Sequence, residues 1–273
     1  SEALQNTAGE RMKNALWRVT NNRVKGVLTG MSITTVIQSS SATTVMLVGF
    51  VNAGLIDLIQ ATGIVFGANI GTTVTGWIVA IVGFKFKINT LALPAIGIGF
   101  FMRFLNRERV TYWGDFLLGF GMLFLGLGIM SDSVRDLRDH PVIMNFMTTY
   151  RASDIPSTMM VILVGTLVTM LIQSSSATMA MTMAMAVNGL IDFPTAAALI
   201  LGENIGTTIT ANLAAIGASV AAKRTARVHF LFNFIGVLWV LALFKPVFIP
   251  LVDRVLPGNP VEPSFIADHM AAF

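Results

Sequence analysis

Charged residues are scarce in this chain, and cysteine is absent. Only 12% of the 273 residues are charged and 54% are hydrophobic, whereas a soluble domain carries about 25% charged residues. The lack of cysteine excludes disulfides and thiolate metal sites. No sustained alternation of apolar and polar residues is present, which argues against an outer-membrane barrel. The composition therefore indicates an all-α polytopic membrane protein.

The net charge of +4 is carried by short basic segments and does not indicate a nucleic-acid partner. Residues 1–26 interleave Arg and Lys with apolar side chains, which predicts an amphipathic interfacial helix on the cytoplasmic side. A solvated linker is the alternative for that segment. Residues 251–273 are expected to form a C-terminal tail, which turns apolar again as though a further segment followed.

Two polar interruptions occur within apolar segments, and each is present twice. Gln-Ser-Ser-Ser at 38–41 returns at 173–176, and Gly-x-Asn-Ile-Gly-Thr-Thr at 67–73 returns at 202–208. Both have the same offset (173 − 38 = 135 and 202 − 67 = 135). A twofold internal duplication in a membrane protein is typical of a transporter. We therefore predict repeat 1 at 27–105, a connecting span and linker at 106–157, and repeat 2 at 158–250.

The relative orientation of the repeats depends on how residues 27–52 meet the membrane. Each half of this segment has about 11 residues, which is too short to cross a bilayer. If the chain turns back at the serines, the basic residues at 1–26, 103–109 and 223–227 share one side, as the positive-inside rule requires. Lys85 and Lys87 then lie on the other side. We expect two inverted-topology repeats, each with a re-entrant helical hairpin and an interrupted transmembrane helix.

Hairpin tips at membrane depth can bind an anion and a cation together. Helix N-termini present N–H groups to anions, C-termini present carbonyls to cations, and hydroxyls serve either ion. The candidate anion-binding residues are Gln38, Ser39, Ser40, Ser41, Gln173, Ser174, Ser175 and Ser176. The candidate sodium ligands are Ser40, Thr43, Asn69, Thr72, Thr73, Ser175, Thr178, Glu203, Asn204, Thr207 and Thr208. Close packing of small hydroxyl residues between helices is the competing interpretation.

No lysine or arginine occurs inside the interrupted segments. An anion bound there would have no fixed cation as partner, and an unpaired buried charge is prohibitively costly. We therefore expect Na⁺ to bind beside the anion as the coupling ion, with no other metal or cofactor. Glu203 is the only carboxylate in these segments and is either functional or a buried structural acid. Asp57 and Asp192 are expected to cap helices.

These motifs resemble those of the type II sodium-dependent phosphate cotransporters. The resemblance covers about residues 27–245 and includes both repeated motifs and the His-Phe-Leu-Phe-Asn sequence at 229–233. It implies a secondary active transporter of the inner (cytoplasmic) membrane that moves inorganic phosphate inward with Na⁺ by alternating access. It also implies that the two hairpins form the substrate site. Residues 91–98 lack the aspartate of electrogenic animal members, so the resemblance leaves the stoichiometry open.

Several alternatives remain at this stage. Glu203 could serve a proton-coupled symporter or a symporter of another oxyanion, and the same dipoles could line a passive anion channel. A serine-nucleophile enzyme would need a base near a serine, but His140, His229 and His269 all lie outside the hairpins. The chain is therefore not expected to be an enzyme. The expected partners are phosphate, Na⁺ and the lipid bilayer, and a homodimer is a candidate assembly.

Overall fold

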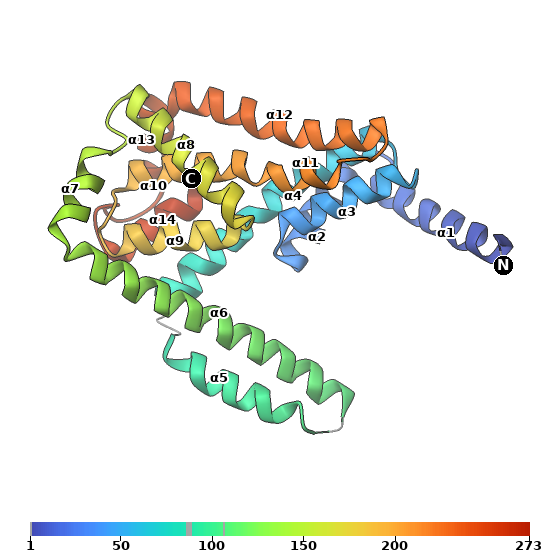
Figure 1. The fold of residues 1–273 in the computed structure, drawn as a ribbon, viewed down its shortest axis with the longest axis horizontal. Coiled ribbons are helices and arrows are strands. Elements are labelled where there is room, and N and C mark those ends of the chain that lie inside the picture. The colour runs from blue at the N-terminus through green and yellow to red at the C-terminus, as the bar shows by residue number, and fades with distance from the viewer. Residues whose placement is uncertain (1, 86–88, 106) are drawn as a thin grey trace. The chain divides into compact units, whose positions relative to one another are not determined.

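The computed structural model describes residues 2–85, 89–105 and 107–273, and the regular elements within these ranges are all helices (Figure 1). Four helical segments of the described chain are long and apolar enough to cross a membrane: Leu58–Phe84, Glu108–Arg138, Ile155–Ile172 and Val220–Val255. The predicted all-helical fold is confirmed. Lys87, one of the residues used to predict the topology, lies outside the described residues.

The chain divides into two compact units. The first comprises residues 1–75, 159–178 and 198–248. It contains α1 (Glu2–Thr20), α2 (Arg23–Ile37), α3 (Ser40–Asn52), α11 (Thr208–Ala214), α12 (Val220–Leu243) and the π-helix η2 (Phe244–Phe248). Most of α4 (Leu58–Ile78) also belongs to it, with parts of α8 (Ile155–Ile172), α9 (Ser175–Val187) and α10 (Phe193–Gly206). Both Gln-Ser-Ser-Ser motifs and both Gly-x-Asn segments therefore lie in this unit.

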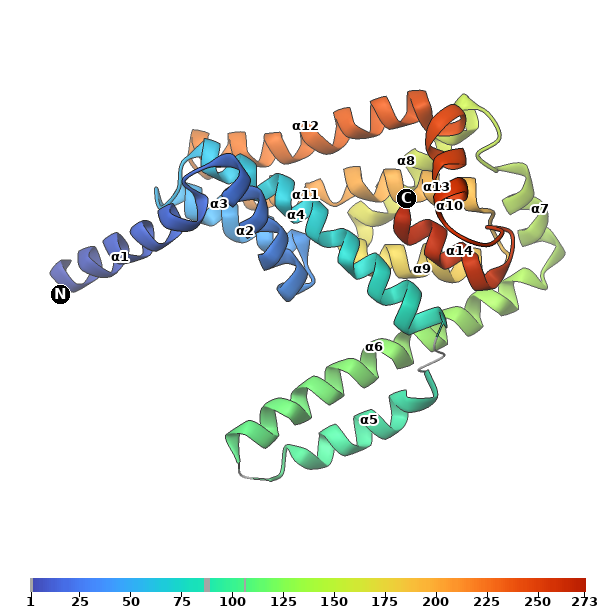
Figure 2. The same ribbon diagram turned by 180° about the vertical axis from the view of Figure 1, so that it is seen from behind.

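The second unit comprises residues 76–158, 179–197 and 249–273. It contains the π-helix η1 (Val79–Lys85), α5 (Asn89–Met102), α6 (Glu108–Arg138), α7 (Pro141–Thr149), α13 (Ile249–Val255) and α14 (Pro263–Ala272). Helices α5 and α6 lie side by side in Figures 1 and 2. Their backbones approach closely at Gly99 and Gly114, where a Cβ on either residue would lie within 2.9 Å of the other's carbonyl oxygen.

The helices that flank the serine motifs are longer than the sequence predicted. Helices α2 and α3 have 15 and 13 residues, and α8 and α9 have 18 and 13. At 1.5 Å per residue, 13 residues extend about 20 Å, which is less than the ~30 Å hydrocarbon core of a bilayer. Helix α8 reaches the minimum length of a spanning helix. Helices α3 and α9, which follow the serine motifs, are too short to cross a bilayer.

Candidate functional site

The first serine motif forms a sharp turn between two helices. Helix α2 ends at Ile37, and Gln38 then adopts the left-handed conformation with φ 57° and ψ 27°. The backbone N–H of Gln38 donates to the carbonyl of Thr34 at 2.7 Å. Ser39 is extended, and its Oγ accepts the N–H of Ala42 at 3.1 Å, which caps α3. The polar residues therefore end one helix and begin the next.

The second serine motif repeats this turn. Gln173 also has φ 57°, its N–H donates to the carbonyl of Thr169 at 2.8 Å, and Ser174 Oγ accepts the N–H of Ala177 at 3.3 Å. Among the described residues, Gln38 and Gln173 are the only non-glycine residues with positive φ. This conformation costs a non-glycine residue about 1–3 kcal/mol and is typical of functional sites.

The first turn folds the chain back on itself. Thr34 Oγ1 in α2 donates to Thr43 Oγ1 in α3 at 3.1 Å, although nine residues separate them. In a straight helix their Cα atoms would be about 13.5 Å apart. Thr43 Oγ1 in turn donates to the carbonyl of Ser39 at 2.9 Å. Residues 23–52 therefore form two helices joined by a turn at Gln38 and Ser39, and one hydrogen bond links the two helices.

Four serine hydroxyls of the two motifs remain available for a ligand. In the described chain, the hydroxyls of Ser40, Ser41, Ser175 and Ser176 make no hydrogen bond. Ser40 is buried, and the other three are partly buried. They occupy the first turns of α3 and α9, where the backbone N–H groups have no acceptor within the helix. This combination of donors suits an oxyanion.

The Gly-x-Asn-Ile-Gly-Thr-Thr segments do not break their helices in the predicted way. Helix α4 is continuous from Leu58 to Ile78, so the interruption predicted at 67–73 is wrong. In repeat 2, α10 ends at Gly206 and α11 begins at Thr208. Thr207 between them has φ −56° and ψ −28°, which are still helical.

The glycines of these segments allow helix packing instead. A Cβ on Gly67 would lie 2.7 Å from the N atom of Met31 in α2 and would overlap the carbonyl of Val27. A Cβ on Gly202 would lie 2.8 Å from the N atom of Thr166 in α8 and would overlap the carbonyl of Ile162. Each contact of repeat 2 is offset by 135 residues from its counterpart (202 − 67, 166 − 31, 162 − 27). The duplication therefore extends to tertiary contacts, which we call the glycine seam of each repeat.

Most predicted sodium ligands beyond the serines bond to their own helix. The side chains of Asn69, Thr72, Thr73, Thr178, Thr207 and Thr208 each donate to a carbonyl three or four residues earlier. Asn204 is exposed, and Glu203 is buried at 3% exposure. The hydroxyl and amide oxygens retain lone pairs, so these hydrogen bonds orient the groups without blocking coordination.

Helix α11 of repeat 2 packs against α3 of repeat 1. Ala211 and Ala215 of α11 share one hydrophobic cluster with Leu47, Val48 and Val51 of α3. The second unit contains a related contact: Met179 Sδ lies 3.4 Å from the position of a Cβ on Gly76, and these residues are the repeat counterparts of Thr44 and Ala211 (44 + 135, 211 − 135). The helix that follows each serine motif, α3 or α9, thus contacts a residue of the other copy of the duplicated sequence.

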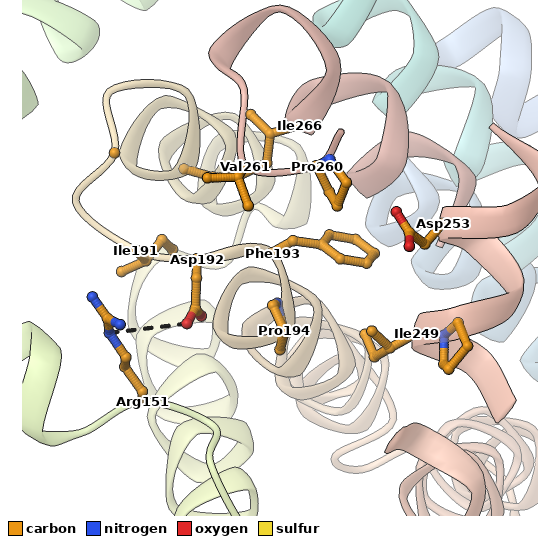
Figure 3. Close-up of a pocket in the computed structure, with 13 residues that line it drawn as sticks. Arg151, Ile191, Asp192, Phe193, Pro194, Ile249, Asp253, Pro260, Val261 and Ile266 are labelled. Carbon is orange, nitrogen blue, oxygen red and sulfur yellow. Dashed lines mark ion pairs between the residues drawn. The ribbon is translucent and has the colours of Figure 1, made fainter. Parts of the chain in front are cut away.

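The two aspartates are helix caps, as predicted. Asp57 Oδ1 accepts the N–H of Gln60 at 2.8 Å, and Asp192 Oδ1 accepts the N–H of Thr195 at 3.0 Å. Asp192 also lines a cavity of about 620 Å³ in the second unit, where it lies 3.9 Å from Arg151 (Figure 3). None of the residues that line this cavity belongs to the repeated motifs.

Sequence reasoning assigned no role to Thr34 and Thr169, which precede the two turns by one helical turn. Both are buried, at 1% and 0% exposure. The sequence signal that could have identified them is that threonine occurs at equivalent positions of the two copies (34 + 135 = 169).

Comparison with known proteins agrees with the resemblance drawn from the motifs. The Na⁺/Pi-cotransporter family profile matches residues 1–132 and 146–248. The uncharacterized protein YqeW of Bacillus subtilis is 31% identical over 243 residues, which are 88% of this chain and 75% of that protein. YjbB of Salmonella typhimurium, a proposed inorganic phosphate export protein, is 30% identical over 240 residues, 87% of this chain and 42% of that protein.

An animal protein matches a shorter part. Sodium-dependent phosphate transport protein 2A of Rattus norvegicus is 41% identical over 63 residues, which are 23% of this chain and 10% of that protein. This chain thus spans less than half the length of YjbB and a tenth of the rat protein. No solved structure matches the chain.

Proposed function

The chain belongs to the Na⁺/Pi-cotransporter family, and on that basis we propose that it carries inorganic phosphate across the inner membrane, coupled to Na⁺, by alternating access. The observation that carries this proposal is the pair of identical left-handed turns at Gln38 and Gln173. Each turn sets unpaired serine hydroxyls at the start of a helix. A transport function requires no catalytic group, in keeping with the expectation that the chain is not an enzyme.

Phosphate binds, in this proposal, to the two serine motifs. The hydroxyls of Ser40, Ser41, Ser175 and Ser176 donate to its oxygens together with N–H groups in the first turns of α3 and α9. Ser39 and Ser174 accept a capping hydrogen bond, which orients them and leaves their O–H groups free to donate. The side-chain amides of Gln38 and Gln173 complete the site.

Na⁺ supplies the positive charge that the hairpin segments lack. The hairpin segments 27–52 and 158–187 contain no lysine or arginine, so a divalent phosphate has no fixed counter-charge there. The cost of burying an unpaired anion falls when cations bind beside it. Hydroxyl, amide and carbonyl oxygens suit a hard cation of this size. The proposed ligands are those predicted from the sequence, with Glu203 as the one carboxylate.

The two repeats have inverted topology in this proposal, and their hairpins enter the membrane from opposite sides. The contacts that recur at an offset of 135 residues support a structural duplication. The length of α3 and α9, 13 residues each, supports arms that end within the bilayer. The repeat limits at 27–105 and 158–250, the interfacial role of residues 1–26 and a homodimeric assembly are part of the same proposal.

The direction of transport has two candidates. The resemblance implies inward symport driven by Na⁺, whereas the name of YjbB describes export. A coupled carrier is reversible, so the direction follows the ion gradients rather than a feature of the site. We favour symport, in which both ions cross together, because segments 27–52 and 158–187 contain no basic residue to hold phosphate without Na⁺.

Flux measurements in liposomes test this function. Purified protein is reconstituted, and labelled phosphate uptake is followed with an inward Na⁺ gradient, an outward Na⁺ gradient, or choline on both sides. We expect accumulation above equilibrium with the inward gradient and net release from phosphate-loaded vesicles with the outward one. Equal uptake in choline would exclude Na⁺ coupling. Equilibration without accumulation would indicate a passive anion channel.

A further inference from the structure

Thr169 has a buried hydroxyl without a hydrogen-bond partner in the described part of the chain. Its side chain is 0% exposed, and its Oγ1 neither donates nor accepts. Other threonines of this hairpin use their hydroxyls: Thr166 donates to the carbonyl of Ile162 at 2.9 Å, and Thr178 donates to that of Ser174 at 2.9 Å. The hydroxyl of Thr169 makes no such bond to its own helix. Buried hydroxyls that stay unpaired are rare and call for a specific partner.

The equivalent threonine of repeat 1 has such a partner. Thr34 Oγ1 donates to Thr43 Oγ1, which joins the two arms of the first hairpin. Repeat 2 contains the same two residue types at Thr169 and Thr178, but no hydrogen bond joins them. The threonine pair is thus joined by a hydrogen bond in repeat 1, whereas in repeat 2 the hydroxyl of Thr169 stays unpaired. Thr35 also has an unpaired hydroxyl, but its side chain is only partly buried.

The surroundings of Thr169 favour a cation. Thr169 lies in the last turn of α8, whose final carbonyls lack partners within the helix and form the negative end of its dipole. The Cβ of Thr169 lies 2.7 Å from the position that a Cβ on Gly206 would occupy. The hydroxyl is therefore at the glycine seam between α8 and α10. No positively charged side chain occurs in residues 158–187. An anion would be repelled at this helix end.

We propose that Thr169 Oγ1 is a ligand for Na⁺ at the base of the second serine turn. This inference rests on the proposed function, since it names an additional ligand for the coupling ion. The ion sits against the carbonyl end of α8, while phosphate binds at the N–H end of α9 on the other side of the turn. Binding of Na⁺ at the end of α8 thus favours binding of phosphate at the start of α9, because the two opposite charges attract across the turn.

Three variants of purified protein in detergent test this assignment by two readouts. Thr169→Val keeps the shape of the side chain and removes the oxygen, Thr169→Ser keeps the oxygen, and Thr166→Val removes a hydroxyl already bonded to Ile162 and Gly202. The first readout is the NaCl concentration, against choline chloride, that gives half-maximal thermal stabilisation without phosphate. The second is the Na⁺ concentration for half-maximal phosphate uptake in liposomes.

We expect Thr169→Val to raise both Na⁺ concentrations by on the order of tenfold or more, the loss expected for one ligand to a charged group. Thr169→Ser should remain within about twofold of the parent protein. Thr166→Val should unfold at lower temperature with its Na⁺ dependence unchanged.

An unchanged Na⁺ dependence in Thr169→Val would overturn the assignment and leave the proposed function intact, as would an equal effect of Thr166→Val. A parent protein that transports phosphate without any response to Na⁺ would instead overturn the coupling itself, and the assignment with it.

Discussion

The glycine seam of repeat 1 makes a quantitative prediction about stability. In Gly67→Ala, the new methyl group would lie 2.7 Å from the N atom of Met31 and 2.8 Å from the carbonyl carbon of Val27. Favourable contacts between such atoms lie near 3.5 Å, and the methyl group would also overlap the carbonyl oxygen of Val27, so α2 and α4 must separate by at least about 1 Å. A gap of that size forfeits a quarter to a half of the dispersion energy of the facing atoms.

The expected cost of Gly67→Ala is the overpacking energy less the gain in helix propensity. Overpacking of a tight interface costs about 1–3 kcal/mol or more, and alanine gains about 1 kcal/mol over glycine within a helix. The overlap with the Val27 carbonyl places the overpacking cost at about 2–3 kcal/mol, so we expect a net destabilisation of about 1–2 kcal/mol. Gly49→Ala in α3 is the matched control, since a Cβ on Gly49 meets no atom within 4 Å. It should be neutral or stabilising by about 0.5–1 kcal/mol.

Thermal unfolding in detergent, followed by tryptophan fluorescence, compares the two variants. A difference of about 1–3 kcal/mol corresponds to roughly 2–12 °C in midpoint for a chain of this size. Gly202→Ala should behave like Gly67→Ala, because it makes the equivalent contacts with α8. If Gly67→Ala and Gly49→Ala unfold at the same temperature, the close contact between α2 and α4 is not present in the protein.

Two further predictions concern the turn and the buried acid. Gln38→Gly should raise the free energy of unfolding by about 1 kcal/mol, because glycine adopts φ 57° without strain. The same variant should impair phosphate transport, because it lacks the side-chain amide. Greater transport together with greater stability would exclude a binding role for the side chain. Glu203→Gln should keep Na⁺-dependent phosphate uptake while raising the Na⁺ concentration needed several-fold. Uptake driven by a pH gradient in Na⁺-free medium, and lost in Glu203→Gln, would indicate proton coupling instead.

The serine turns could be predicted because their signal is local. A polar sequence in an apolar run, repeated at a fixed offset, indicates that the helix ends at Gln38 and at Gln173, and both residues follow a helix end with φ 57°. The capping roles of Asp57 and Asp192 are local in the same way. The hydrogen bonds that form the turns and the caps join residues within four positions of one another.

The course of α4 could not be predicted, because it depends on a distant contact. Gly67 and Gly71 have low helix propensity, so the sequence favoured an interruption. The structure keeps the helix intact, because both glycines face the backbone of α2, about 40 residues earlier along the chain. The unpaired hydroxyl of Thr169 was also beyond prediction, since Thr169 and the paired Thr34 each stand four residues before the same Gln-Ser-Ser-Ser-Ala-Thr sequence.

Equilibrium binding of phosphate to the purified protein tests the central claim most directly. Labelled phosphate is titrated in NaCl and in choline chloride, with the parent protein, Ser40→Ala, Ser175→Ala and the exposed control Ser32→Ala. We expect binding only in NaCl, weakened by on the order of tenfold or more in Ser40→Ala and Ser175→Ala and unchanged in Ser32→Ala. Equal binding by all four proteins, or a loss confined to Ser32→Ala, would show that the serine turns are not the phosphate site.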